Sequence, residues 1–126
     1  EHPQEPMLLV MDEIFSSTNY REGFSAAYSI LRYLATTFPH LLGFVTTHFH
    51  GLTELENHSK GKIRNFCFDA TKKDGKISYT YELHRGSSQA HLALEILEQN
   101  GIGHEILRIA NQVYTTLDNP KLPAFI

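Results

Sequence analysis

The sequence contains the run Met7-Leu8-Leu9-Val10-Met11, which is followed directly by the carboxylates of Asp12 and Glu13. Consecutive apolar residues of this kind are typical of a strand that is buried in a parallel sheet. Because two adjacent charged residues do not continue such a strand, it is predicted to end at Asp12. The pattern therefore predicts two carboxylates at the C-terminal tip of a buried strand.

A second apolar run, Leu41 to Val45, ends in Thr46-Thr47-His48. In open α/β sheets the carboxyl ends of the parallel strands form the edge where ligands bind. If the two runs are neighbouring strands, Asp12, Glu13 and His48 are expected at that edge. Two carboxylates and a histidine suit a magnesium–nucleotide site better than they suit a structural core.

Residues 20–38 carry apolar side chains at the i, i+3, i+4 and i+7 positions of an amphipathic helix. Thr18 or Asn19 can cap its first turn, and Pro39 ends it. A strand, a helix and a second strand at residues 41–46, in this order, predict an α/β fold with parallel strands.

A β-hairpin is predicted next, because Asp74-Gly75 separates strand-like runs at residues 63–71 and 76–84. Along the second of these strands, apolar and polar residues alternate. This alternation predicts that one face of the strand is buried and the other is wet. The residues of the predicted buried face are Ile77, Tyr79, Tyr81 and Leu83.

Three further helical segments are predicted from the spacing of apolar residues. Residues 52–56 are predicted to form one helical turn, and two longer helices are predicted at about 88–99 and 103–116. Gly101 lies between the two longer helices and is suited to a left-handed cap. The C-terminal part of the chain is therefore predicted to be a helix pair.

The length, composition and net charge of the chain limit the classes of protein to which it can belong. With 126 residues the chain is one domain or part of one, and 41% hydrophobic and 20% charged residues are typical of a globular protein. The net charge of −3 gives no electrostatic case for direct contact with nucleic acid. No run approaches the roughly 18 apolar residues of a membrane span, so no membrane partner is expected.

Cys67 is the single cysteine of the chain, so an internal disulfide is excluded. A lone cysteine favours a reducing compartment, and we therefore expect an intracellular protein. Because Cys67 lies within an apolar, strand-like run, we interpret it as a buried and inert thiol.

A strand that ends in Asp-Glu is the arrangement called Walker B. Asp12 would hold Mg²⁺, because a hard cation prefers carboxylate oxygen, and Glu13 would polarise the water that attacks a γ-phosphate. His48 ends the neighbouring strand, where it could lie beside Glu13 and touch that phosphate. The segment at Asp12 by itself fits a strand end with two solvated acids better, and it is His48 that favours the nucleotide site.

Zinc is the rival interpretation of the histidines, because His48 and His50 form a His-Phe-His sequence. A zinc site usually needs three or four ligands. The nearby candidates His40, His58 and Cys67 have no convincing ligand spacing, and we therefore favour the nucleotide site.

A polar loop joins the two acids to the first helix. Such a loop could face a second subunit, although an ordinary cap and turn explains its composition equally well. The loop residues that we consider as candidates are Ser16, Ser17, Thr18 and Asn19.

Taken together, the segments between Met7 and Tyr114 resemble the C-terminal part of the ATPase domain of the MutS mismatch-repair family. Met7 to Ile14 looks like the Walker B strand of that family. Residues 46–52, Thr-Thr-His-Phe-His-Gly-Leu, are similar to its Thr-His-Tyr-His-x-Leu switch segment. The hairpin, Gly86-Ser87-Ser88 and the helix pair around Gly101 correspond to the remainder of the domain.

The resemblance implies a partial P-loop NTPase of the ABC-ATPase-like class, with parallel strands, a β-hairpin and a C-terminal helix pair. It implies a DNA-dependent ATPase that works with ATP and Mg²⁺ as a homodimer or a dimer of paralogues. The DNA, mismatched or branched, would be recognised through upstream domains. Residues 1–126 would be the C-terminal portion of the ATPase domain, with residues 88–117 as a helical dimerisation segment.

The resemblance also implies roles for single residues. Asp12 would be the Mg²⁺ carboxylate, Glu13 the catalytic base and His48 the sensor of the γ-phosphate. The loop from Ser16 to Asn19 would approach the nucleotide that is bound to the partner subunit.

The sequence departs from the family pattern at three points, one of which is Ser-Gln-Ala-His at residues 88–91 in place of Ser-Tyr-Gly-Ile. Residues 15–20 read Phe-Ser-Ser-Thr-Asn-Tyr, where the family typically has Gly-Arg-Gly-Thr-Ser-Thr. No Gly-x-x-x-x-Gly-Lys-Ser/Thr motif occurs in the 126 residues, so they contain no cradle for the β-phosphate. The chain is therefore expected to supply half of a nucleotide site and not to bind ATP tightly by itself. The alternative is a non-catalytic dimerisation or regulatory module derived from a MutS ATPase.

Overall fold

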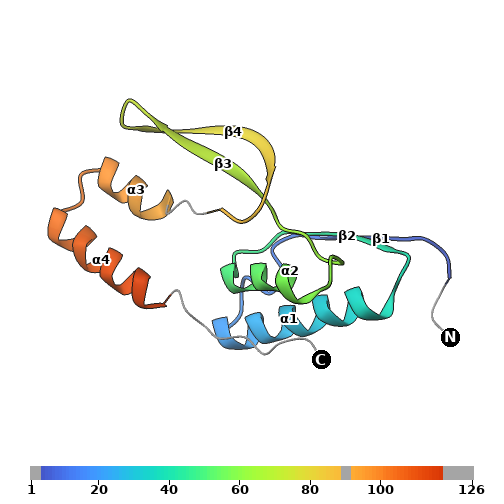
Figure 1. Ribbon diagram of the computed structural model, residues 1–126. Coiled ribbons are helices and arrows are strands. Elements are labelled where there is room, and N and C mark those ends of the chain that lie inside the picture. Colours follow the sequence, from blue (N-terminus) through green and yellow to red (C-terminus); the bar gives the residue numbers. More distant parts are fainter. Residues whose placement is uncertain (1–3, 89–91, 118–126) are drawn as a thin grey trace. The chain divides into compact units, whose positions relative to one another are not determined.

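The computed structural model describes residues 4–88 and 92–117, and these form two compact units that divide between Arg64 and Asn65. Figure 1 labels the helices and strands along the chain. In chain order they are β1 (Met7–Met11), α1 (Tyr20–Thr37), β2 (Leu41–Val45), the 3-10 helix η1 (His50–Glu54), α2 (Leu55–His58), β3 (Phe66–Lys73), β4 (Lys76–Arg85), α3 (Leu92–Gln99) and α4 (His104–Leu117).

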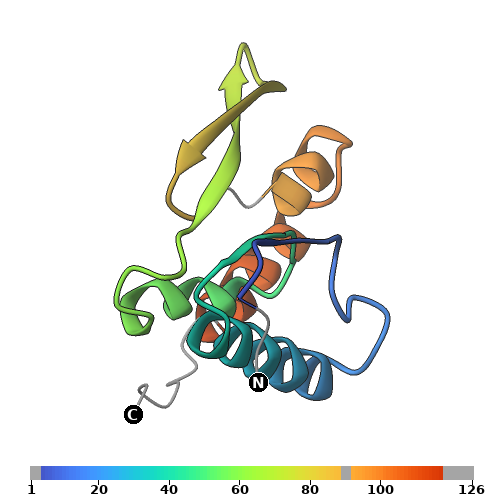
Figure 2. The ribbon, with the colours of Figure 1, turned by 90° about the vertical axis from the view of Figure 1, so that its right-hand side faces the viewer.

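In the first unit, β1 and β2 pair in parallel, in a register that runs from Met7 opposite Leu41 to Met11 opposite Val45. Helix α1 connects the strands and lies on one side of the pair (Figure 1, Figure 2). The predicted strand–helix–strand arrangement is therefore confirmed. Helix α1 ends one residue earlier than predicted, because Phe38, which precedes a proline, takes an extended conformation.

The prediction that the first strand is buried is wrong for one of its two faces. Met7, Leu9 and Met11 are half-buried, whereas Leu8 and Val10 are 69% and 71% exposed. Opposite them in β2, Leu42 and Phe44 are exposed as well. Helix α1 lies on only one side of the strand pair, and no second layer occurs among residues 4–64.

The buried core of the first unit lies mainly outside the strands. Helix α1 packs there against η1, α2 and the residues that follow the two strand tips. The predicted helical turn at residues 52–56 is confirmed, and it belongs to a longer segment that η1 and α2 form together. The buried apolar residues are Ile14, Ala27, Tyr28, Phe49, Leu52 and Leu55.

In the second unit, β3 and β4 form the predicted antiparallel hairpin. Asp74 and Gly75 make its two-residue turn with φ angles of 51° and 73°. Both angles are positive, as a type I′ turn requires, which explains why Asp-Gly is a strong hairpin signal.

The predicted burial of one face of β4 is wrong. Tyr79 is 49% exposed, Leu83 is 58% exposed and Tyr81 is 82% exposed, and only Ile77 is half-buried. The pairing of the strands shifts between Phe68 and Ala70, and Tyr81 has a left-handed backbone with a φ of 58°. A β-bulge of this kind interrupts the alternation of faces on which the prediction relied.

The helix pair is present, with a later start for its first helix than predicted. Ser88, its predicted first residue, is not helical; residues 89–91 lie outside the described residues, and α3 is described from Leu92 onward. The predicted cap at Gly101 is confirmed, since its φ is 78° and its N–H donates to the carbonyl of Glu98 at 3.0 Å. The N–H of Ile102 donates to the carbonyl of Leu97 at 3.1 Å, which completes a Schellman motif.

Candidate functional site

At the carboxyl edge of the strand pair, Thr46 makes hydrogen bonds to the residues at the end of β1. Met11 and Val45 form the last pair of the parallel register, so Asp12 and Thr46 are the first residues beyond it. The N–H of Thr46 donates to the carbonyl of Met11 at 3.0 Å. Its hydroxyl donates to Oδ1 of Asp12 at 2.5 Å and accepts from the N–H of Glu13 at 2.8 Å.

The structure brings Glu13 and His48 together at this edge. Nε2 of His48 lies 2.7 Å from Oε1 of Glu13, a hydrogen bond in which the ring N–H donates to the carboxylate. The two side chains remain 78% and 51% exposed for His48 and Glu13 respectively. Exposed pairs of this kind contribute about 1 kcal/mol or less, so a ligand could redirect either side chain at little cost.

The backbone turns sharply directly after the two acids. Glu13 and Phe15 have φ angles of 47° and 57°, a left-handed region that non-glycine residues seldom adopt. The N–H of Ser16 donates to the carbonyl of Glu13 at 3.2 Å and closes the first turn. This turn directs Ile14 into the core, where it is 7% exposed, while the preceding carboxylates of Asp12 and Glu13 stay in solvent.

Helix α1 packs directly against this loop. The side-chain oxygen of Asn19 accepts a hydrogen bond from the N–H of Arg21 at 3.0 Å and caps the helix. A Cβ atom added to Gly23 would lie 2.8 Å from the Phe49 ring, and 2.9 Å from both the Phe15 carbonyl and the Thr18 methyl group. Only a residue without a side chain permits this approach.

A hollow of about 310 Å³ opens between the loop and His48. Its wall contains both apolar and hydroxyl groups, and the Tyr20 and Phe49 rings meet edge to face with their centroids 5.4 Å apart. The lining residues are Ile14, Ser16, Thr18, Tyr20, His48 and Phe49.

The four loop candidates therefore have different positions. Ser16 and Thr18 line the hollow together with His48, whereas Ser17 is exposed outside that lining. Asn19 is also exposed, and its side-chain oxygen is engaged by the helix cap. The loop thus combines a cap-and-turn structure with two hydroxyl-bearing residues, Ser16 and Thr18, that line the hollow.

Sequence reasoning missed the contributions of Thr46, Tyr20 and Phe49. The role of Thr46 had a signal in the sequence, because counting a parallel register from the two apolar runs aligns Thr46 with Asp12. Tyr20 and Phe49 gave no such signal, since their contact depends on how α1 packs against η1.

The side chains near the strand edge differ in which metal ion they could hold, zinc or magnesium. Among residues 4–88 and 92–117, no three histidine, cysteine, aspartate or glutamate side chains gather as a metal site, and this includes the histidines considered for zinc. Asp12 and Glu13 offer carboxylate oxygens, which suit Mg²⁺ when phosphate oxygens and water complete the coordination. The residues present fit a magnesium–nucleotide better than a metal held by protein ligands alone.

Cys67 is half-buried, so its predicted full burial is wrong. Its thiol donates to Oδ1 of Asp69 at 3.8 Å. Burial raises the pKa of this thiol, and the charge and hydrogen bond of Asp69 raise it further. A thiol whose pKa is raised stays protonated, which agrees with the interpretation of Cys67 as an inert residue.

The first unit is thus an α/β structure in which paired acids and a histidine meet at the carboxyl edge of parallel strands. The sequence profile of the family MutS domain V matches residues 1–118 of the chain. The chain belongs to this family, and the predicted resemblance to MutS is confirmed.

Curated relatives extend this assignment. The chain is 26% identical over 115 residues to the DNA mismatch repair protein MutS of Clostridium kluyveri. It is 29% identical over 118 residues to the protein of that name in Ruminiclostridium cellulolyticum, and 27% identical over 120 residues to that in Leptospira interrogans. These matches cover 90%, 91% and 95% of the chain, which spans only 13%, 13% and 14% of the relatives' lengths.

No helix within residues 4–88 and 92–117 has the length and apolar character that crossing a membrane would require.

Proposed function

We propose that the chain is part of a MutS-type, DNA-dependent ATPase that acts in DNA mismatch repair, and that its strand edge is the hydrolytic half of the nucleotide site. The observation that carries this proposal is the 2.7 Å contact between His48 and Glu13, beside the Asp12 carboxylate. Membership of the MutS domain V family supports it.

Each residue at the edge has a distinct role in this proposal. Bound ATP and Mg²⁺ would supply the reacting phosphate and a compensating positive charge. Asp12 would orient the hydrated cation through its carboxylate. Glu13 would accept the proton of the attacking water, and His48 would leave Glu13 to donate a hydrogen bond to the γ-phosphate.

The loop from Ser16 to Asn19 is proposed to approach a nucleotide held by the partner subunit. Ser16 and Thr18 are the best placed of the four, because both line the hollow beside His48. Hydroxyl groups can donate to phosphate or ribose oxygens. Ser17 would contact the partner from its exposed position, and Asn19 would hold the loop through its cap of α1.

The rest of a P-loop NTPase domain is proposed to cover the exposed strand face. Parallel sheets are almost always covered on both faces. In this chain Leu8, Val10, Leu42 and Phe44 form an apolar face on which each side chain is between 59% and 71% exposed. The phosphate-binding loop that residues 1–126 lack would belong to the same covering part of the protein.

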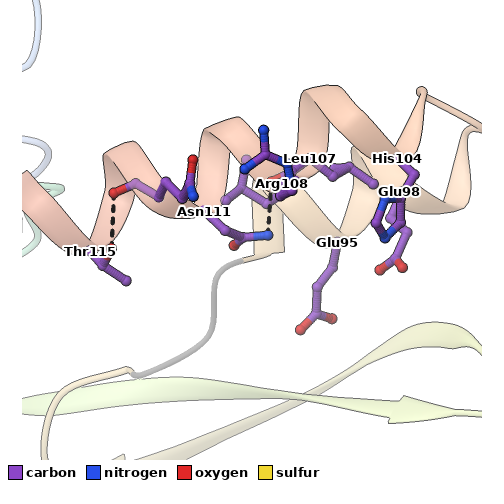
Figure 3. Close-up of a pocket in the computed structure, with 9 residues that line it drawn as sticks. Glu95, Glu98, His104, Leu107, Arg108, Asn111 and Thr115 are labelled. Carbon is purple, nitrogen blue, oxygen red and sulfur yellow. Dashed lines mark hydrogen bonds between the residues drawn. The ribbon is translucent and has the colours of Figure 1, made fainter.

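The helix pair within residues 88–117 is proposed as the dimerisation segment. None of the described residues of this segment is buried, and α4 carries a stripe of Ile106, Ile109 and Val113 that is about half exposed. The stripe lies outside the lining of the groove of about 600 Å³ that α3 and α4 form, where Figure 3 shows Glu95 and Arg108. Exposed apolar stripes of this kind favour a protein partner.

Substitution of Ile109 by aspartate in the full-length protein is expected to weaken dimerisation at least about tenfold, a loss of roughly 1.4 kcal/mol. The reason is that the charge would lose its water in the interface. Sedimentation velocity over a range of concentrations measures the effect. The matched control is Asn111→Asp, which adds the same charge on the groove side of α4. Equal dimerisation of Ile109→Asp and the unmodified protein would exclude this stripe from the interface.

The ATPase rate of the full-length protein, with and without mismatched or branched DNA, tests the proposed function. We expect hydrolysis that is stimulated by the DNA. A protein that forms dimers and does not hydrolyse ATP would instead be a non-catalytic dimerisation or regulatory module. That second function is favoured by one feature within residues 1–126, the altered loop at residues 15–20.

A further inference from the structure

We propose that Thr46 is a positioning residue of the hydrolytic site, whose hydroxyl sets the Asp12 carboxylate and the Glu13 backbone at the same time. The inference rests on the proposed ATPase function and adds to it a residue that acts through its neighbours. Thr46 does not line the hollow beside His48. Its contacts are instead directed at the two acids.

Three hydrogen bonds join Thr46 to three consecutive residues of the other strand tip. Its N–H donates to the carbonyl of Met11 at 3.0 Å, which continues the strand pairing. Its hydroxyl donates to the carboxylate of Asp12 at 2.5 Å and accepts from the N–H of Glu13 at 2.8 Å. A threonine hydroxyl has one proton and two lone pairs, so it can make both side-chain bonds at once.

The bond to Asp12 is expected to orient its carboxylate. A hydroxyl that donates to an ionised carboxylate makes a short, charge-assisted hydrogen bond. Because Oδ1 of Asp12 is held by Thr46, the carboxylate is restricted in rotation and Oδ2 is directed away from that bond. Residues that hold a metal ligand in this way typically change metal affinity or activity by about 10- to 100-fold when they are removed.

The bond to Glu13 holds a backbone that is strained. The φ of Glu13 is 47°, in the left-handed region that costs a non-glycine residue free energy. Such a conformation persists only where surrounding contacts determine it, and the acceptor that Thr46 offers to the Glu13 N–H is one of these contacts. Loss of the hydroxyl would therefore loosen the turn that directs Glu13 toward His48.

The test compares Thr46→Val, which keeps the shape and removes the hydroxyl, with Thr46→Ser, which keeps the hydroxyl. Thr36→Val is a matched control, because the Thr36 hydroxyl bonds only to carbonyls of its own helix α1. All variants are made in the full-length protein. Three quantities are measured: kcat for ATP, the Mg²⁺ concentration that half-saturates binding of a fluorescent ATP analogue, and hydrogen exchange of the peptide 12–19 without metal or nucleotide.

We expect Thr46→Val to lower kcat and to raise the half-saturating Mg²⁺ concentration, each by about 10- to 100-fold. We also expect faster exchange of the peptide 12–19 in this variant. Thr46→Ser and Thr36→Val are expected to stay close to the unmodified protein in all three measurements. A threonine hydroxyl that only stabilised the fold would not change the Mg²⁺ requirement of nucleotide binding.

Two results would overturn the inference. One is an unchanged Mg²⁺ requirement and unchanged exchange in Thr46→Val, and the other is equal damage in Thr46→Val and Thr46→Ser. If the unmodified protein does not hydrolyse ATP, the proposed ATPase function fails. The exchange of the peptide 12–19 and the Mg²⁺ requirement of binding then still decide whether Thr46 positions the two acids.

Discussion

Replacement of Glu13 by alanine in the full-length protein is expected to abolish ATP turnover and to leave ATP binding in place. The carboxylate lies at the carboxyl edge of the parallel strands, 2.7 Å from Nε2 of His48, where the proposed hydrolysis would need a general base for water. General-base catalysis typically contributes about 10²- to 10⁴-fold to a rate, so kcat should fall by this order. Single-turnover hydrolysis and equilibrium nucleotide binding separate the two effects.

Two further variants sharpen this experiment. Glu13→Gln keeps the shape of the side chain and an oxygen that can accept from His48, so it removes little except the base. Glu22→Ala removes an exposed carboxylate from the first turn of α1 and should leave kcat unchanged. Hydrolysis that persists in both Glu13 variants would exclude Glu13 as the base.

Gly23→Ala is expected to destabilise the first unit, although alanine is the better helix former. Alanine in a helix gains about 1 kcal/mol over glycine. At this position, however, the new methyl group would lie 2.9 Å from the Phe15 carbonyl, a backbone atom that cannot rotate away. Overpacking of this kind costs about 1–3 kcal/mol. We therefore expect a net loss of up to about 2 kcal/mol in the free energy of unfolding.

Urea unfolding of the chain 1–126, followed by circular dichroism, measures this loss. Gly43→Ala is the matched control, because a Cβ atom at Gly43 would meet no heavy atom within 4 Å. Hydrogen exchange of the peptide 12–19 should also increase in Gly23→Ala, since the loop has to move to admit the methyl group. If the variant is more stable than the unmodified chain, the loop admits the methyl group without a loss in the free energy of unfolding, and the prediction is wrong.

Local patterns predicted the elements of this fold well. The helix cap formed at Asn19, one of the two predicted positions, and the hairpin turn at Asp74-Gly75 and the left-handed cap at Gly101 formed as expected. Each of these features depends on the backbone preferences of a few neighbouring residues, so a short stretch of sequence is enough to predict it.

Burial was predicted less well, for a physical reason. An apolar run shows that a strand face needs a partner, but it does not show which part of the protein supplies that partner. Leu8 and Val10 were therefore predicted to be core residues, whereas they are exposed in the described part of the chain. In β4, the left-handed backbone of Tyr81 interrupts the alternation of side chains between the two faces of the strand. A tyrosine does not favour this conformation, so the sequence did not predict the irregularity.

The sequence by itself determined the strand–helix–strand order, the hairpin, the helix pair and the location of Asp12, Glu13 and His48 after strand tips. These features follow from periodicity and turn chemistry, which act over a few residues. Only the tertiary structure decided that Thr46 bonds to both acids and that Gly23 must lack a side chain. Those contacts join residues that are distant in sequence, so they depend on strand register and helix packing, which no local pattern contains.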